Sequence, residues 1–131
     1  MKITVDTNVL VRAVVKDNLR QSKKAIKILK EASMIAVSLT SLCELVWVLL
    51  RLYKIPVEEV LKAIKVLISA QNVEVNRLAV EVGLRQLEEG GDFADAVIAY
   101  EGKWLGAETF VSFDKKAVDI LKKHHQSAVL L

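Results

Sequence analysis

The feature that most constrains the fold is a regular alternation of short β-rich runs with longer segments of helical periodicity. The β-rich runs are "KITVD", "MIAVS", "VEV", "TFVSFD" and "SAVLL", which start at residues 2, 34, 73, 109 and 127. Helical patterns over 8–15, 18–33, 39–54, 56–70, 76–90, 92–106 and 115–123 separate them. Strands joined through helices pair in parallel, and parallel sheets are covered on both faces. The alternation therefore predicts an α/β fold, a three-layer α/β/α sandwich with a mostly parallel central sheet of four to five strands.

Length and composition agree with this class. A chain of 131 residues predicts a single domain, residues 1–131, and 53% hydrophobic residues suit a sheet that is covered on both faces. No apolar run reaches the roughly 20 residues that cross a bilayer, so we expect no membrane association. The lone Cys43 indicates a packing role in a reducing compartment and hence a cytoplasmic location. A net charge of +3 permits a nucleic-acid ligand without requiring one.

Acidic residues stand where the predicted strands end or helices begin. Asp6 closes the first strand and Asp114 closes "TFVSFD", while Asp92 and Asp95 open the helix that follows the Gly90–Gly91 pair. The carboxyl ends of parallel strands share one edge of the sheet, where functional crevices form in open α/β folds. Each of Asp6, Asp92 and Asp114 has an equally good explanation as a helix N-cap.

Glu44 is the only charged residue within "LCELVWVLL", residues 42–50. A helix that is apolar on nearly every side is expected to be buried. A buried carboxylate should be paired, protonated or bound to a metal, because an unpaired charge there costs several kcal/mol. Several carboxylates with few histidines favour a hard cation, Mg²⁺ or Mn²⁺.

Four motifs in order, "VDTNVLVRAV", a glutamate in the helix after the second strand, "DFADAVIA" and "FVSFDKKA", resemble the PIN-domain ribonucleases over essentially the whole chain. Among the PIN-domain ribonucleases, the group that the chain most resembles is the toxins of VapBC-type toxin–antitoxin systems. The resemblance implies a metal-dependent endoribonuclease that leaves a 5′-phosphate and a 3′-hydroxyl.

The resemblance also implies the roles of individual residues. Asp6, Glu44, Asp95 and Asp114 match the catalytic, metal-binding acids, and Asp92 would be a fifth acid in the same pocket. The position inside "FADA" favours Asp95 over Asp92 as the direct ligand. Polar residues that would support these acids are Thr7, Asn8 and Ser112, the last standing where the family more often has threonine. Basic residues that follow the motifs, and that we expect to hold RNA, are Arg12, Arg51, Lys54, Lys115 and Lys116.

The expected partners are an RNA substrate, a cognate VapB-type antitoxin and a second copy of the chain. The segments 46–52 and 57–68 carry more apolar residues than one inward face needs, which suggests a dimer or antitoxin surface there. The lysines of the segment 18–33 are more simply interpreted as a solvated helix face. Three alternatives remain open: a PIN-like module that binds RNA or protein without cutting, an RNA-processing nuclease without a toxin role, and an α/β domain whose acids only cap helices.

Overall fold

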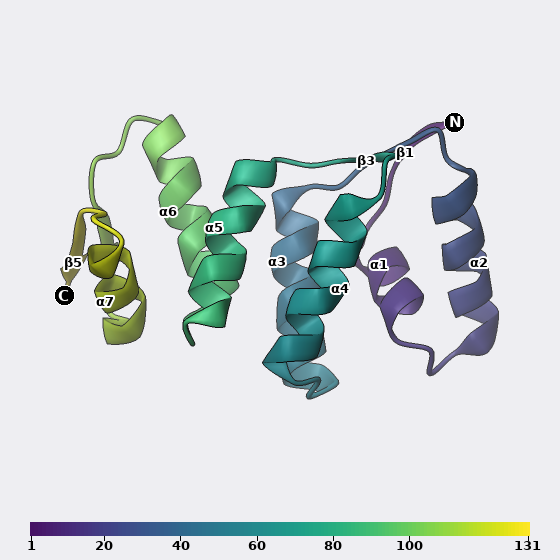
Figure 1. Ribbon diagram of the computed structural model, residues 1–131, viewed down its shortest axis with the longest axis horizontal. Helices are drawn as coiled ribbons and strands as arrows, with labels where there is room; N and C mark the ends of the chain where they lie inside the picture. Colours follow the sequence, from purple (N-terminus) through teal and green to yellow (C-terminus); the bar gives the residue numbers. More distant parts are fainter. The chain divides into compact units, whose positions relative to one another are not determined.

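The computed structural model describes residues 1–131, and the contacts of the chain divide it into two compact units. Unit 1 comprises Met1–Asn76 and unit 2 comprises Arg77–Leu131. In Figure 1 unit 1 runs from purple to teal and unit 2 from teal-green to yellow. Each unit is described by itself.

Unit 1 is built on a three-stranded parallel sheet in the order β1-β2-β3. The strands are β1 (Lys2–Thr4), β2 (Met34–Ala36) and β3 (Val73–Glu74). Ile35 of the central strand pairs with Ile3 on one side and Val73 on the other. Its side chain is almost fully buried, as expected for the middle strand of a covered sheet.

Helices connect these strands, as the alternation predicts. They are α1 (Thr7–Val14), α2 (Leu19–Glu31), α3 (Leu39–Trp47) and α4 (Val57–Ser69). The core of unit 1 includes Leu10 of α1, Leu42 and Leu45 of α3, and Val60 and Ile64 of α4, all nearly inaccessible to solvent. Burying each such side chain contributes about 1.5–3 kcal/mol to folding.

The predicted helix over 39–54 is interrupted. After Trp47 it widens into a π-helical segment, η1 (Val48–Leu52), in which the backbone N–H of Tyr53 donates to the carbonyl of Val48. Lys54 then takes a left-handed conformation, with φ of 52°, and ends the segment. Hydrophobic periodicity does not distinguish such a wide turn from an ordinary helical one, so the sequence does not reveal it.

Unit 2 contains three helices and a two-stranded parallel sheet, β4-β5. Its elements are α5 (Arg77–Glu88), α6 (Phe93–Trp104), β4 (Phe110–Ser112), α7 (Lys115–Lys123) and β5 (Ala128–Leu130). Val118 and Leu121 of α7 pack with Ala128 of β5 against Ala99 and Phe110. The result is a small core that holds α7 on the parallel strand pair.

Glycines fix the path from α5 into α6. A side chain at Gly83 would lie 2.6 Å from the ring of Phe93, so only glycine lets the two helices approach this closely. Gly90 adopts φ of 91° just beyond α5, where the Gly90–Gly91 pair predicts the helix to stop. The start of α6, with Asp92 and Asp95, is therefore held firmly against the end of α5.

The predicted α/β class and its parallel strands are confirmed. The strands number three in one sheet and two in the other, rather than forming the single sheet of four to five that the sequence predicts. Pro56 lies one position outside α4, as its N-cap residue. None of the helices combines the length and hydropathy needed to span a bilayer.

Candidate functional site

Asp6 lies between β1 and α1 and caps α1. Its backbone is extended, and its Oδ1 accepts a hydrogen bond from the backbone N–H of Val9 at 3.2 Å. The cap interpretation of this residue is therefore correct. The side chain is exposed, so capping through one oxygen leaves the carboxylate accessible to a ligand.

The expectation that Glu44 is buried is wrong. The helix α3 buries Ser41, Leu42, Leu45 and Val46, whereas Glu44 lies on an exposed face with Trp47. The physical reason is that α3 packs through one face only. Apolar residues also occur on its exposed face, where Trp47 lies beside Glu44, so an apolar composition does not imply that every side chain is buried. The burial argument for a bound cation at Glu44 consequently does not hold.

Thr7 connects the two acids of unit 1. As the first residue of α1 it follows Asp6, and its hydroxyl donates a hydrogen bond to Oε2 of Glu44 at 3.0 Å. The predicted supporting residue thus orients the carboxylate of Glu44 beside the start of α1. A groove of about 490 Å³ also opens beside Asp6 and Asn8, between α1 and α2.

In unit 2 the same arrangement recurs at two helix starts. Asp92 caps α6 by accepting from the N–H of Ala94 at 2.9 Å. Asp114 caps α7 by accepting from the N–H groups of Lys116 and Ala117, at 3.0 and 3.2 Å. The hydroxyl of Ser112 accepts the N–H of Asp114 at 2.9 Å and so fixes the turn that aims this carboxylate.

Asp95 lies in the first turn of α6 and is partly buried. Burial and then the negative charges of Asp92 and Asp114 raise its pKa to about 6. All three influences disfavour the ionised form. The structure therefore brings Asp92, Asp95 and Asp114 within electrostatic range of one another. Within either unit, no three His, Cys, Asp or Glu side chains are assembled as a ready metal site.

These observations agree with a comparison of the whole sequence against protein families. The PIN-domain family model matches residues 3–123. The chain belongs to the PIN-domain family. The match spans both units and includes every acid described above. Family membership supports the α/β fold class that the sequence predicts.

Among solved structures, this PIN domain is similar to VapC20 of Mycobacterium tuberculosis, a toxin that cleaves the sarcin–ricin loop. The two share 19% identity with a TM-score of 0.46, over 91% of this chain and 95% of that chain. At this level of identity and TM-score the likeness carries no argument about the activity or substrate of this chain. A search of curated proteins finds no significant match.

The basic residues predicted to hold RNA differ in their surroundings. Lys115 forms a salt bridge with Asp119 at 2.7 Å, one turn along α7. Arg51, Lys54 and Lys116 are exposed and form no salt bridge. All four side chains are accessible from solvent.

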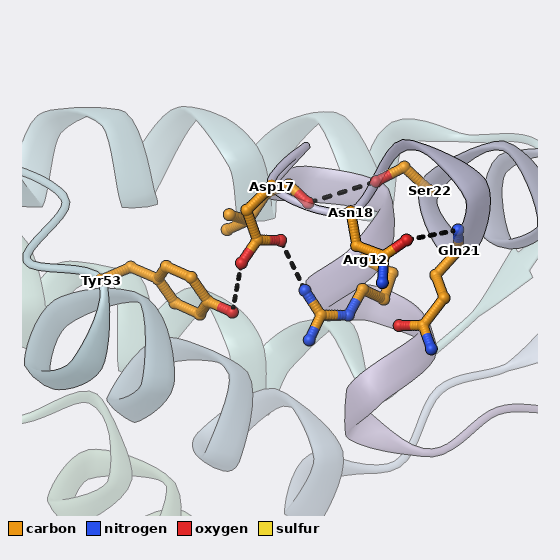
Figure 2. A network of polar contacts seen from close by, with 7 residues as sticks. Arg12, Asp17, Asn18, Gln21, Ser22 and Tyr53 are labelled. Atoms are coloured by element: carbon orange, nitrogen blue, oxygen red, sulfur yellow. Dashed lines mark hydrogen bonds and ion pairs between the residues drawn. The ribbon is translucent and has the colours of Figure 1, made fainter.

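Arg12 belongs to a polar network that the sequence does not predict (Figure 2). Its Nη1 lies 2.5 Å from Oδ1 of Asp17, and the hydroxyl of Tyr53 donates to Oδ2 of Asp17 at 3.2 Å. Although burial opposes ionisation, the hydrogen bonds from Arg12 and Tyr53 hold the pKa of Asp17 below its ordinary value. Asp17 precedes α2, but nothing in the sequence indicates that Tyr53 lies near it.

A second unforeseen contact joins α7 to the segment after α5. His124, expected in an exposed stretch, is half-buried, and its Nε2 lies 2.6 Å from Oε2 of Glu89. The neighbouring Lys123 contacts the other oxygen of Glu89 at 3.3 Å. These contacts anchor the chain next to Gly90 and Gly91, just before the acids of α6.

Proposed function

We propose that this PIN domain is a divalent-metal-dependent endoribonuclease. The observation that carries the proposal is the match of the PIN family over residues 3–123. The motif resemblance supports it, because no acid of that pattern is missing from the chain. We further propose that both units act together as one domain, and that the acids of both serve one reaction. Those acids are Asp6, Glu44, Asp92, Asp95 and Asp114.

The donor set suits Mg²⁺ or Mn²⁺. Carboxylate oxygens are the ligands these cations prefer. Burial and then repulsion from Asp92 and Asp114 raise the pKa of Asp95, and a bound cation would offset both by favouring the ionised carboxylate. A bound cation would neutralise the acids, polarise a phosphodiester and lower the pKa of a bound water. Asp95 would bind it directly, with Asp6, Glu44 and Asp114, and Asp92 would supply further negative charge.

The chain's own residues hold these acids in place. The hydroxyl of Thr7 orients Glu44, Ser112 fixes the turn before Asp114, and Asn8 borders the groove beside Asp6. In the proposed reaction one carboxylate accepts the proton of the attacking water. Hydrolysis then gives a 5′-phosphate and a 3′-hydroxyl, as the resemblance to PIN ribonucleases implies.

We also propose that the enzyme is the toxin of a type II toxin–antitoxin pair, working in the cytoplasm as a homodimer and inhibited by a VapB-type antitoxin. The motif resemblance supports the toxin role. Exposed apolar side chains of unit 1 suit a protein partner on the predicted segments, namely Trp47, Leu52, Val57 and Val66.

Cap-preserving variants test the nuclease proposal most sharply. Asparagine caps a helix about as well as aspartate, so Asp6→Asn and Asp114→Asn keep the cap and remove the charge. Glu44→Gln likewise keeps an acceptor for Thr7. We expect each to abolish RNA cleavage in Mg²⁺ or Mn²⁺ while leaving the melting temperature nearly unchanged. Glu81→Gln, which removes an exposed acid of α5, is the control and should cleave normally.

Two outcomes would count against parts of this proposal. If chelator and all three variants leave cleavage unchanged, the activity does not come from these acids. If RNA binds but is never cut, the chain is a PIN-like binding module. The toxin role is tested by inducing the wild-type chain and Asp6→Asn in cells, where only the wild type should arrest growth.

A further inference from the structure

The groove between α1 and α2 has a mixed lining. Asp6, Asn8 and Arg12 contribute from the α1 side, and Gln21 and Lys24 from α2, above a floor formed by Val9, Ala25 and Ile28. Its polar side chains include two cations and two amides that can donate hydrogen bonds. The proposed catalytic acid Asp6 belongs to the same lining.

A strongly basic face of α2 borders this groove. Residues 21, 24, 25 and 28 recur at helical spacing and form the groove wall. Along the helix the exposed cations are Arg20, Lys23, Lys24, Lys27 and Lys30. None of these cations forms a salt bridge, so their charge is available to a polyanion.

Arg12 is held at the other wall by the network shown in Figure 2. Asp17 binds its Nη1 and is itself bound by Tyr53, which comes from the residue after η1. A guanidinium carries five N–H donors in a rigid plane. Because the carboxylate of Asp17 holds Nη1, the orientation of the whole guanidinium is fixed, and so is the direction of its other N–H donors.

We propose that the groove between α1 and α2 binds the phosphodiester backbone of the RNA strand, with Lys24 and Arg12 as phosphate contacts and with Asp17 and Tyr53 as residues that position Arg12. Charge complementarity selects this occupant, because Arg20 and Lys27 lie one turn on either side of Lys24 and continue its positive charge along the edge of the groove. The inference rests on the proposed function, since it places the substrate of that enzyme beside Asp6.

The role of Lys24 is tested by equilibrium binding of a labelled single-stranded RNA of about 15 nucleotides, in chelator so that no cleavage occurs. We expect Lys24→Gln to weaken binding about threefold to tenfold and to lower the slope of log K against log salt by about 0.7, one single-strand phosphate contact. Lys65→Gln, an exposed lysine on α4, removes the same charge from unit 1 and is the control. Equal effects of the two variants would overturn the assignment of the groove.

Substitution of Asp17 distinguishes a pure charge effect from a positioning role, because the two predict opposite changes in RNA affinity. If charge alone matters, Asp17→Asn removes a negative group and strengthens RNA binding. If Asp17 positions Arg12, the same variant weakens binding about threefold to tenfold, and its effect disappears in an Arg12→Gln background. Tyr53→Phe changes no charge and should weaken binding about twofold for the same reason. Tighter or unchanged binding by both variants would overturn the positioning role.

These measurements are independent of the nuclease proposal. Wild-type protein that binds RNA through Lys24 but never cuts it would refute the nuclease and leave the groove assigned. Wild-type protein that cuts RNA with Lys24→Gln indistinguishable from Lys65→Gln would retain the nuclease and refute the groove.

Discussion

Replacing Asp95 by asparagine should stabilise the metal-free protein at neutral pH. The folded environment raises the pKa of Asp95 from an ordinary 3.8 to about 6, so the ionised carboxylate is less stable in the folded than in the unfolded chain. A shift of about two units corresponds to at most about 3 kcal/mol. Because much of the side chain remains exposed, solvent screening reduces this to about 1 kcal/mol.

The sign of the pH dependence follows from the same linkage. The penalty is complete above about pH 6, where Asp95 is ionised in both states, and it declines as the pH falls through 6 toward 3.8. Asp95→Asn should therefore melt about 4 °C higher than wild type at pH 7.5 in chelator, with the gap closing by about pH 4. Thermal unfolding at several pH values measures both.

Asp119→Asn is the control for this experiment, because Asp119 is exposed and already paired with Lys115. Its substitution should change stability by less than about 0.5 kcal/mol and give no gain at neutral pH. Adding Mg²⁺ or Mn²⁺ should raise the melting temperature of the wild type more than that of Asp95→Asn. An Asp95→Asn variant no more stable than Asp119→Asn at pH 7.5 would refute the claim that burial and the neighbouring acids destabilise the ionised form of Asp95.

Three further predictions concern other parts of the chain. Thr7→Val should lower cleavage at least tenfold, a loss of about 1.4 kcal/mol or more, by removing the donor to Glu44, while Thr7→Ser retains activity in the same assay. Glu89→Gln should destabilise the protein at pH 7 but not near pH 3. Hydrogen bonds from His124, which caps the end of α7, and from Lys123 lower the pKa of Glu89, and their contribution to stability is lost once Glu89 is protonated. Gly83→Ala should lower the free energy of unfolding by about 1–3 kcal/mol, because the added methyl group overlaps the ring of Phe93. Gly102→Ala is the control: the nearest atom to its added methyl group lies at 3.8 Å, so chemical denaturation should show unchanged or higher stability.

Much of the secondary structure could be predicted, because the helices and strands begin and end where periodicity and glycine positions in the sequence indicate. The helix α7 spans Lys115–Lys123 as its periodicity predicts, and the Gly90–Gly91 pair ends α5 where the sequence indicates. The division of the strands between two sheets could not be predicted, because strand order depends on contacts between distant segments. The same is true of the pairing between Tyr53 and Asp17, which are 36 residues apart.

The site illustrates a different limit. The sequence left each of Asp6, Asp92 and Asp114 as either a cap or a ligand, and the structure shows that all three are caps. A cap uses backbone N–H groups at a helix start, where partial positive charge gathers, and that same location favours an anionic substrate. Capping and catalysis are therefore compatible at one carboxylate. Capping needs only a hydrogen-bond acceptor, whereas binding a cation needs the negative charge. Substitution by asparagine keeps the acceptor and removes the charge, so it separates the two roles.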